Sequence, residues 1–540
     1  MLTKRARSRL GIAAVATGGA HALSYPYAGW ALLALVAYLP MMLVLWRDRP
    51  TPKHAFFAGL LAGAVLHGVG HYWIAFTAQK MSGMPAPLAW LVVLVYALAM
   101  GLHQALWAWS CALLREAFWG DEEVPPLAWV VAVASLLAVV EFVVPYQFPW
   151  YLGNALYTVP IFMQVADLAG IWLVTLLCGL VSGGLAVVWL AGTGRHRVRA
   201  VGLVVALLLA WLSYGGWRMA AIDAQAPTRT ITVAMIQPNP TIGEKTSLKP
   251  KPRIPMQSRA EKLTRAVLAK EGAGQIDVVV WPEGSLPFYY VHKELPPLTD
   301  HETKTRAPPV VKHTTFRAHK FAKTIGKPLL IGSLRRTDRS WKAKAHNSAV
   351  LLDGSVGSGV MPQAIYDKRQ LVPFGEYLPG STLIPALARA IPGVSDLGPG
   401  THSSIMEIAG AKFGVSICYE ALFAGFMLDN SAPADVLVNL TDDLWFGPTN
   451  APELHVMVQY PRAVELRRPL LRATATGVSG HIDAAGRVRS RTGVWTEATL
   501  VERAEIRDLD SVFRHFGLWP MRGLALGCAV LLVGAWRRRA

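Results

Sequence analysis

Long apolar runs limit what the first 222 residues of this chain can fold into. Apolar residues fill positions 10–222 and return only at 518–536. A helix needs about 20 mostly apolar residues to cross a bilayer, and eight segments meet or approach that length. They lie near 10–24, 28–46, 55–77, 87–114, 127–145, 161–191, 200–219 and 518–536. The sequence therefore predicts a polytopic α-helical membrane bundle of about eight spans.

The charge composition supports this interpretation. Only 16% of the 540 residues are charged, whereas roughly 25% are charged in a typical soluble domain. This shortage argues against an ordinary soluble enzyme, and the hydrophobic content of 53% argues against a disordered chain. Much of the basic charge behind the formal net charge of +18 lies beside the apolar segments. We interpret it as a topology signal and expect no nucleic-acid partner.

The positions of Lys and Arg predict how the chain crosses the membrane, because short loops rich in them stay in the cytoplasm. With the N-terminus inside, the short outer loops hold only Lys80. The inner segments hold Lys4, Arg5, Arg7, Arg9, Arg47, Arg49, Lys53, Arg115, Arg195, Arg197, Arg199, Arg537, Arg538 and Arg539. We therefore expect both termini in the cytoplasm and the polar segment 223–517 exported.

The start of the chain also resembles a secretory signal. Ala20-His21-Ala22 follows a basic start and a short apolar run, as a signal-peptidase site does. We expect this segment to be retained, because further spans follow it with no soluble domain between. Cleavage would reduce the number of spans and leave segment 223–517 exported.

Segment 223–517 alternates β-branched runs with helical stretches, which favours a layered α/β domain. Expected strands are 230–237, 277–281, 328–333, 348–352, 412–417, 435–440, 470–474 and 500–506, and expected helices include 258–270, 314–324 and 452–466. The stretches 247–257 and 291–313 indicate loops. We thus predict three parts: a bundle of about seven spans (1–222), an exported catalytic domain (223–517), and a C-terminal spanning helix with a basic tail (518–540).

Cys418 is the only cysteine of segment 223–517, so it has no partner there for a disulfide. The other cysteines, Cys111, Cys178 and Cys528, fall in predicted spans, where a thiol usually packs as a small apolar group. Cys418 follows the predicted strand 412–417. Two interpretations of it are open at this point: a catalytic nucleophile, or a buried inert thiol.

Three motifs favour the nucleophile. DVVVWPEGSLP (277–287) ends an apolar strand in the acid Glu283, and YDKRQLVPFGEYLP (366–379) holds Lys368 and Glu376. SICYE (416–420) places Glu420 two residues after Cys418. In this chain order, glutamate, lysine and cysteine resemble the catalytic triad of the nitrilase superfamily. The contexts WPE, K-x-x-L-V-P-F-G-E-Y and C-Y-E, with the eight apolar segments, are similar to its membrane-embedded branch, the apolipoprotein N-acyltransferases.

The resemblance covers nearly the whole chain and implies a fold and a set of roles. The fold of segment 223–517 would be an α-β-β-α sandwich. Glu283 would be the general base, Cys418 the nucleophile and Lys368 the cation that stabilises the oxyanion, with the N–H of Tyr419 as a second donor. Supporting or substrate-binding positions would be Glu376, Glu420, Tyr419, Trp281 and Trp445.

The implied reaction has two steps. Cys418 takes an acyl chain from a membrane phospholipid as a thioester, and the N-terminal amine of a diacylated apolipoprotein then accepts it. The resemblance implies no cofactor and no metal, a monomer, and a place in the bacterial inner membrane with segment 223–517 in the periplasm. Both substrates are lipids, so we also expect a lid or membrane-dipping arm at 286–290 and 382–391, with internal packing as the alternative.

Some positions depart from the family pattern. No tryptophan follows the first strand before Trp281, Asp442 stands where the family usually has Asn, and Leu444 stands where it has Ala. Asp367 replaces the usual Asn before Lys368, and Ala475-Thr476 replaces Asn-Asn before Gly477. None of these changes touches the triad, so they suggest altered specificity before loss of activity.

Two other functions and one other site stay open. A membrane-tethered nitrilase-like amidase would use the same triad with water as acceptor, but it would need only one membrane anchor. A non-catalytic lipoprotein-binding scaffold predicts a lost triad residue, whereas all three are present. His67 and His71 share a helix face, as metal or haem ligands do, although packing explains that pair more simply.

Overall fold

A computed structural model describes residues 3–25, 29–120, 122–247, 250–287, 289–290, 309–337, 343–354, 362–381 and 395–539. The chain divides into two compact units. The first comprises Met1–Ala224, Glu453–Leu466 and Asp510–Ala540, and the second comprises Gln225–Pro452 and Arg467–Leu509. The expected arm at 382–391 lies outside the described residues, as do Phe288 of segment 286–290 and the stretch 291–308.

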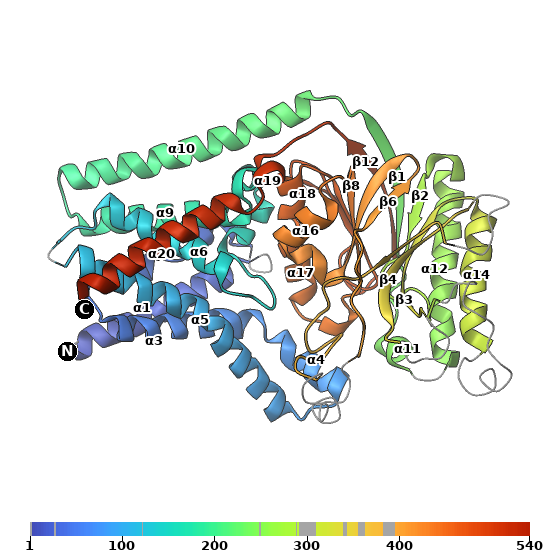
Figure 1. The fold of residues 1–540 in the computed structure, drawn as a ribbon, viewed down its shortest axis with the longest axis horizontal. Helices are drawn as coiled ribbons and strands as arrows, with labels where there is room; N and C mark the ends of the chain where they lie inside the picture. The colour runs from blue at the N-terminus through green and yellow to red at the C-terminus, as the bar shows by residue number, and fades with distance from the viewer. Residues whose placement is uncertain are drawn as a thin grey trace. The chain divides into compact units, whose positions relative to one another are not determined.

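The first unit is built of apolar helices (Figure 1). The longer ones are α1 (Lys4–Leu23), α2 (Leu39–Arg47), α3 (Pro52–Gly70), α4 (Trp73–Ser82), α5 (Ala86–Phe118), α6 (Leu127–Val143), α9 (Ile171–Leu190), α10 (Arg195–Ala224) and α20 (Trp519–Arg539). The other helices are η2 (Ala31–Leu35), η3 (Leu152–Thr158), α7 (Pro160–Met163), α8 (Ala166–Ala169), α18 (Pro461–Leu466), α19 (Val512–Phe516) and most of α17 (Ala451–Gln459).

Within the described residues, four helices are long and apolar enough to cross a membrane: α5, α9, α10 and α20. The pair α3 and α4, bent by 54°, makes a fifth if it counts as one span. The predicted number of eight spans is therefore not confirmed. The predicted span 161–191 is wrong in its extent, because Gly170, at φ 76°, separates α8 from a shorter helix α9.

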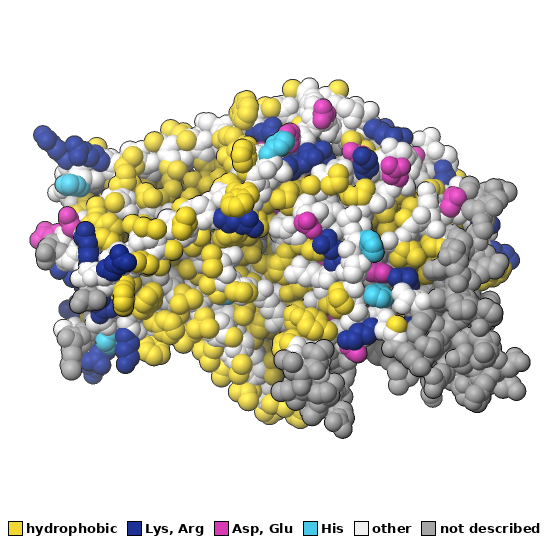
Figure 2. Space-filling model, in the orientation of Figure 1, with side chains coloured by type: hydrophobic (Ala, Val, Ile, Leu, Met, Phe, Trp, Pro, Cys, Tyr) yellow, Lys and Arg dark blue, Asp and Glu magenta, His cyan; other side chains and the backbone are white. Residues whose placement is uncertain are grey.

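The outer surface of the first unit is mostly hydrophobic. Figure 2 shows this over α10 and α20, where Trp217, Leu526 and Val530 are each more than half exposed. Lys and Arg gather instead at the end where both chain termini lie, which includes the last turns of α2 and α20. An apolar belt with cations at one end is the pattern of a membrane-spanning bundle.

Two six-stranded sheets form the second unit. Their strand orders are β12-β1-β2-β3-β4-β5 and β11-β10-β9-β8-β7-β6. The strands are β1 (Arg229–Gln237), β2 (Val278–Val280), β3 (Leu329–Arg335), β4 (His346–Leu352), β5 (Ala364–Asp367), β6 (Ile405–Ile408), β7 (Ala411–Ile417), β8 (Val436–Thr441), β9 (Leu470–Thr474), β10 (Gly480–Ile482), β11 (Val488–Arg491) and β12 (Ala498–Ile506).

The sheets are layered as an α-β-β-α sandwich. Buried residues from both sheets, such as Val233, Val280, Phe413 and Val438, form one shared core. On its other face the first sheet packs against α12 (Pro250–Glu271) and α14 (Pro309–Ile325), as Figure 1 shows. On the second sheet α16 (Ala424–Ser431) covers β7. This is the layered architecture that the resemblance implied for the segment.

All eight predicted strands are confirmed, with ends that shift by one or two residues. The sequence analysis missed β5, β6, β10 and β11, which have only three or four residues each. The loop predicted at 247–257 is wrong, because α12 begins at Pro250. Proline is tolerated in the first turn of a helix, where its missing N–H has no partner to lose.

Strand direction brings the predicted site residues to one edge. Strands β1, β2 and β3 run parallel, and so do β7, β8 and β9. Glu283 follows β2, Cys418 follows β7, and Asp442 follows β8. Lys368 follows the short antiparallel strand β5. Loops after the carboxyl ends of parallel strands are where α/β proteins place their binding sites.

Candidate active site

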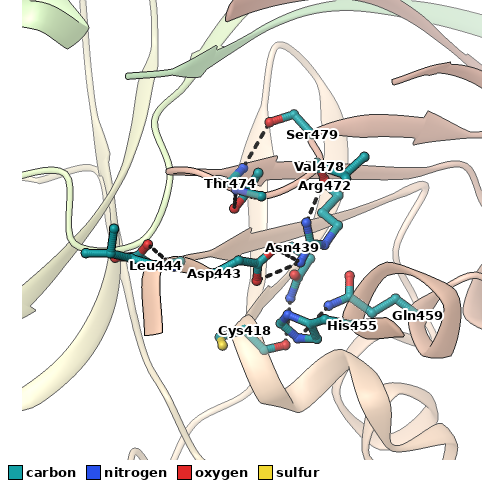
Figure 3. A network of polar contacts seen from close by, with 12 residues as sticks. Cys418, Asn439, Asp443, Leu444, His455, Gln459, Arg472, Thr474, Val478 and Ser479 are labelled. Carbon is teal, nitrogen blue, oxygen red and sulfur yellow. Dashed lines mark hydrogen bonds and ion pairs between the residues drawn. The ribbon is translucent and has the colours of Figure 1, made fainter. Parts of the chain in front are cut away.

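Cys418 occupies a strained turn directly after β7. Its φ is +51°, a left-handed conformation that costs a non-glycine residue on the order of 1–3 kcal/mol. The side chain of Asn439, on the neighbouring strand β8, donates hydrogen bonds to the carbonyl oxygen of Cys418 at 3.2 Å and to Oγ of Ser416 at 3.1 Å. Figure 3 shows Cys418 and Asn439 in this network. The turn presents a partly buried free thiol.

One carboxylate oxygen of Glu283 accepts a hydrogen bond, and the other has no hydrogen-bond partner in the described part of the chain. Its Oε1 accepts a hydrogen bond from Nδ2 of Asn347 at 2.6 Å. Its Oε2 is buried and has no hydrogen-bond partner among the described residues. Burial raises the pKa of Glu283 to about 7, because the nearby charge of Lys368 only partly offsets the loss of water. A carboxylate with such a pKa and a free oxygen is suited to accept a proton near neutral pH.

Lys368 is fully buried and forms an ion pair with Glu376, with Nζ and Oε2 2.8 Å apart. Its backbone is fixed too, since its N–H donates to the carbonyl oxygen of Asn347 at 2.7 Å. Burial lowers the pKa of Lys368, but nearby negative charges, that of Glu376 first, outweigh burial and leave the pKa above its ordinary value. The side chain is therefore an ammonium at every physiological pH.

The charges of Glu283 and Lys368 both act on the Cys418 thiol. Burial raises the pKa of the Cys418 thiol, the charge of Glu283 raises it further, and the ammonium of Lys368 opposes both. The thiol is thus protonated at neutral pH and needs a base to become a nucleophile. The structure brings Glu283, Lys368 and Cys418 into one site, and their roles as a catalytic triad stay a prediction.

Glu420 ties the turn after Cys418 to the loop after Lys368. Its Oε2 accepts from the N–H of Ile417 at 2.8 Å. Its Oε1 accepts from Oη of Tyr366 at 2.8 Å and from the N–H groups of Arg369 at 2.7 Å and Gln370 at 3.1 Å. Burial raises the pKa of Glu420, and the charge of Lys368, followed by the hydrogen bonds from Ile417, Gln370 and Tyr366, opposes the rise. Two turns from different sheets are thereby held together by one carboxyl group.

A buried ion pair supports the loop after β8. Arg472 on β9 donates to both carboxylate oxygens of Asp443, at 3.0 and 2.8 Å, and to the carbonyl oxygen of Val478 at 2.6 Å (Figure 3). A Cβ at Gly477 would lie 1.8 Å from Oδ2 of Asp443, so only glycine fits there. Loss of one partner from such a pair typically costs about 3–5 kcal/mol.

The predicted supporting residues Trp281, Trp445 and Tyr419 differ in burial. Trp281 is fully buried in the layer between the first sheet and its helices, where its Nε1 donates to Oγ1 of Thr264 at 2.9 Å. Trp445 is 45% exposed in the turn η6 (Leu444–Phe446). Tyr419 is buried and its ring packs edge-on against Phe423, with centroids 4.8 Å apart.

Two departures from the family pattern have ionic partners within the chain. Asp442 pairs with Lys245 at 2.7 Å, and Asp367 accepts from Nε of Arg335 at 2.9 Å. Aspartate in place of asparagine is therefore matched by a cation on a neighbouring element at both positions.

The sequence analysis missed Asn347 as a site residue. Its Nδ2 bridges Glu283 and Glu376, donating to Oε1 of each at 2.6 and 2.8 Å. It lies near the start of β4, and no charge pattern around it in the sequence signals a function.

No group of three or more His, Cys, Asp or Glu in the described part of the chain is placed to hold a metal ion. His67 and His71 are both buried, with ring centroids 5.3 Å apart. The rings of Tyr96 and Trp150 pack around them.

Comparisons with known proteins match both parts of the chain. Residues 17–184 match the model of the apolipoprotein N-acyltransferase N-terminal domain, and residues 232–511 match that of carbon-nitrogen hydrolases.

Individual relatives cover most of the chain. A protein named apolipoprotein N-acyltransferase from Geobacter metallireducens is 28% identical over 98% of this chain and 95% of its own length. One of that name from Rhizobium meliloti is 31% identical over 75% of this chain and 69% of its own length. A solved amidase from Nesterenkonia sp. aligns with 54% of this chain and 95% of its own at 18% identity, with a TM-score of 0.37 that is too low to support an inference.

We predict that Gly332→Ala displaces Glu283 and slows the reaction of Cys418. A Cβ at Gly332 would lie 2.4 Å from the Cα of Glu283, so the turn must shift. The rate of Cys418 alkylation by iodoacetamide at pH 7 should fall at least about tenfold, less than the roughly 10²–10⁴-fold of a lost general base, because Glu283 is displaced and not removed.

Gly274→Ala is the matched control, because nothing lies within 4 Å of its added Cβ. The melting temperatures of the two variants should be measured first and should be equal, so that unfolding does not explain a difference in rate. Equal alkylation rates for Gly332→Ala and the control would show that the turn does not position Glu283.

Proposed function

This chain belongs to the apolipoprotein N-acyltransferase family, and we propose that it works through a thioester on Cys418. It N-acylates lipoproteins. The acyl donor is a membrane phospholipid, and the acceptor is the N-terminal amine of diacylglyceryl-cysteine in an apolipoprotein. The observation that carries the mechanism is the free Oε2 of Glu283, in a site that also holds a protonated thiol and a buried ammonium.

In the first half-reaction the Cys418 thiol gives its proton to Oε2 of Glu283 while its sulfur attacks the ester carbonyl carbon of the phospholipid. Negative charge develops on the carbonyl oxygen, and Lys368 together with the N–H of Tyr419 stabilises it. Losing one such donor typically costs about 3–4 kcal/mol. When the intermediate collapses, the alkoxide leaving group takes the proton from Glu283, and lysophospholipid leaves behind an acyl thioester.

The second half-reaction uses the same groups in reverse. The neutral amine of the lipoprotein attacks the thioester carbonyl and passes a proton to Glu283. Collapse then releases the amide and returns that proton to the sulfur of Cys418. A thioester suits this step, since an amine attacks it readily and the amide product is more stable.

Other residues position these groups. Glu376 fixes the ammonium of Lys368 through the 2.8 Å ion pair and can hold the incoming amine. Glu420 sets the distance between the Cys418 turn and the Lys368 loop. The exposure of Trp445 suits a contact with substrate, whereas the burial of Trp281 suits a supporting role in the core.

We place the protein in the bacterial inner membrane as a monomer, with both termini in the cytoplasm and the second unit in the periplasm. The support is the gathering of cations at the end of the bundle that holds the termini. The eight-span layout belongs to the same proposal, with the shorter apolar helices 31–47 and 127–143 as crossing segments.

A water-accepting amidase remains the second candidate, and a non-catalytic scaffold the third. The unpartnered Oε2 of Glu283 and the strained backbone of Cys418 fit a catalytic site better than a site that has lost its activity. In the part of the chain that the structure describes, four or five apolar helices of spanning length exceed the single anchor that an amidase needs.

We predict that the protein in phospholipid vesicles adds one acyl chain to a synthetic diacylglyceryl-cysteine peptide. Mass spectrometry should show the gain on the peptide and an equal amount of lysophospholipid. Cys418→Ala and Glu283→Gln should reduce product at least about 100-fold, because nucleophile and base are both lost from the first step.

Cys528→Ala, in the buried face of α20, should keep full activity as the control. Free fatty acid released at the same rate with or without the peptide would instead show that water accepts the acyl group.

We predict that the transfer rate rises with pH around a midpoint of about 7. Below the pKa of Glu283, about 7, its carboxyl is protonated and cannot accept the thiol proton. The rate should therefore fall about tenfold per pH unit on the acid side. Lys368 has a raised pKa and adds no loss at neutral pH. A midpoint near the ordinary carboxyl value of about 4.3, measured under saturating substrate, would contradict this assignment.

A further inference from the structure

Lys245 forms hydrogen bonds to the turn that carries Glu283. It lies in α11 (Ile242–Thr246), in the loop that follows β1. Its ammonium contacts the carbonyl oxygen of Gly284 at 2.9 Å, that of Glu283 at 3.4 Å, and Oδ2 of Asp442 at 2.7 Å. The side chains of Lys245 and Asp442 are only 12% and 3% exposed. One cation thus joins the loops after β1, β2 and β8.

The turn packs closely against the ammonium of Lys245. Gly284 has φ +63°, and a Cβ there would lie 2.5 Å from Nζ of Lys245. On the other side of the turn, a Cβ at Gly332 of β3 would lie 2.4 Å from the Cα of Glu283. The turn therefore lies between Lys245 and β3, with no room for a side chain on either side.

The helix that carries Lys245 is itself anchored. Oγ1 of Thr241 accepts from the N–H of Glu244 at 3.2 Å, and the Glu244 carboxylate accepts from the N–H of Thr241 at 2.7 Å, which closes a capping box. Glu244 also pairs with Arg259 of α12 at 2.8 Å. Lys245 is thus held from the outer helical layer and does not depend on Asp442 alone for its position.

We propose that Lys245 and Asp442 are a positioning pair that fixes the Glu283 turn and sets the charge beside its carboxyl group. The proposal rests on the proposed function, because it takes Glu283 as the general base. Neither residue touches the reacting atoms. Both act through Glu283, Lys245 by holding its backbone and Asp442 by holding Lys245.

The charges of Lys245 and Asp442 also act on the pKa of Glu283, in opposite directions. The negative charge of Asp442 is among the causes that raise the pKa of Glu283, after burial and Glu376. The ammonium of Lys245 neutralises that charge at 2.7 Å. The groups that face Glu283 from neighbouring elements are Lys368, Glu376, Asn347, Cys418, Asp442 and Lys245.

Removal of Lys245 and removal of Asp442 must therefore shift the pH midpoint of the rate in opposite directions. In Lys245→Met, the charge of Asp442 is left uncompensated, so the pKa of Glu283 rises and the midpoint of the rate moves to higher pH. In Asp442→Asn, a negative charge disappears and Lys245 faces the turn alone, so the midpoint moves to lower pH. A merely structural role predicts no such opposition.

The test is the pH dependence of kcat and KM in the vesicle assay for wild type, Lys245→Met, Asp442→Asn and the double variant. The matched control is Arg317→Met, which breaks an Arg317–Glu261 pair of 2.7 Å in the outer helical layer. We expect kcat of Lys245→Met to fall about tenfold or more, with KM changed less than about twofold, as for a lost positioning contact. Arg317→Met should keep the wild-type kcat and midpoint.

Midpoints displaced by at least about 0.5 pH unit in opposite directions, with the double variant returning toward wild type, would support the pair. Shifts in one direction, or none while kcat stays at the wild-type value, would overturn it. If Lys245→Met falls short of the thermal stability of wild type, Lys245→Arg, which keeps the charge, must restore the midpoint. A wild-type protein without Cys418-dependent transfer would instead refute the proposed function itself.

Discussion

The buried ammonium of Lys368 is the charge on which the arrangement of this site depends. A fully buried cation is tolerated only beside anions and fixed dipoles. Glu376 supplies the closest anion at 2.8 Å, and Asn347 links Glu376 to Glu283 through its amide. The same cation opposes the charge of a thiolate on Cys418. One positive charge thereby sets where the base, its support and the nucleophile lie.

Most of the fold could be predicted from sequence, because the strands of a buried sandwich are continuous apolar runs that stand out from their neighbours. The short strands β5, β6, β10 and β11 could not, since three or four residues carry too little pattern and their pairing is set by long-range contacts. The helix from Pro250 was taken for a loop because its prolines and lysines resemble a turn. In the first unit, eight apolar segments are visible in the sequence, but helix ends and the break at Gly170 depend on packing.

The candidate site was predictable where it follows a strand in a distinctive motif. Glu283, Lys368 and Cys418 each come directly after a strand or within three residues of one, and the structure brings them together. Asn347, Lys245 and Arg472 could not be found in the same way, because they act through partners 29 to 197 positions away. Trp281 belongs to the motif that holds Glu283, yet its side chain packs with Val279 against the outer helices, whereas Val278 and Val280 face the shared core, as alternation along a strand requires.

The central claim is that Cys418 carries the acyl group between the two lipids. The most direct measurement is the intact mass of the purified protein after incubation with one phospholipid and no acceptor. We predict a mass gain of one acyl chain that hydroxylamine removes and that Cys418→Ala does not show, because a thioester at that sulfur is the intermediate of both half-reactions. A folded protein that stays unmodified with several phospholipids would contradict the mechanism.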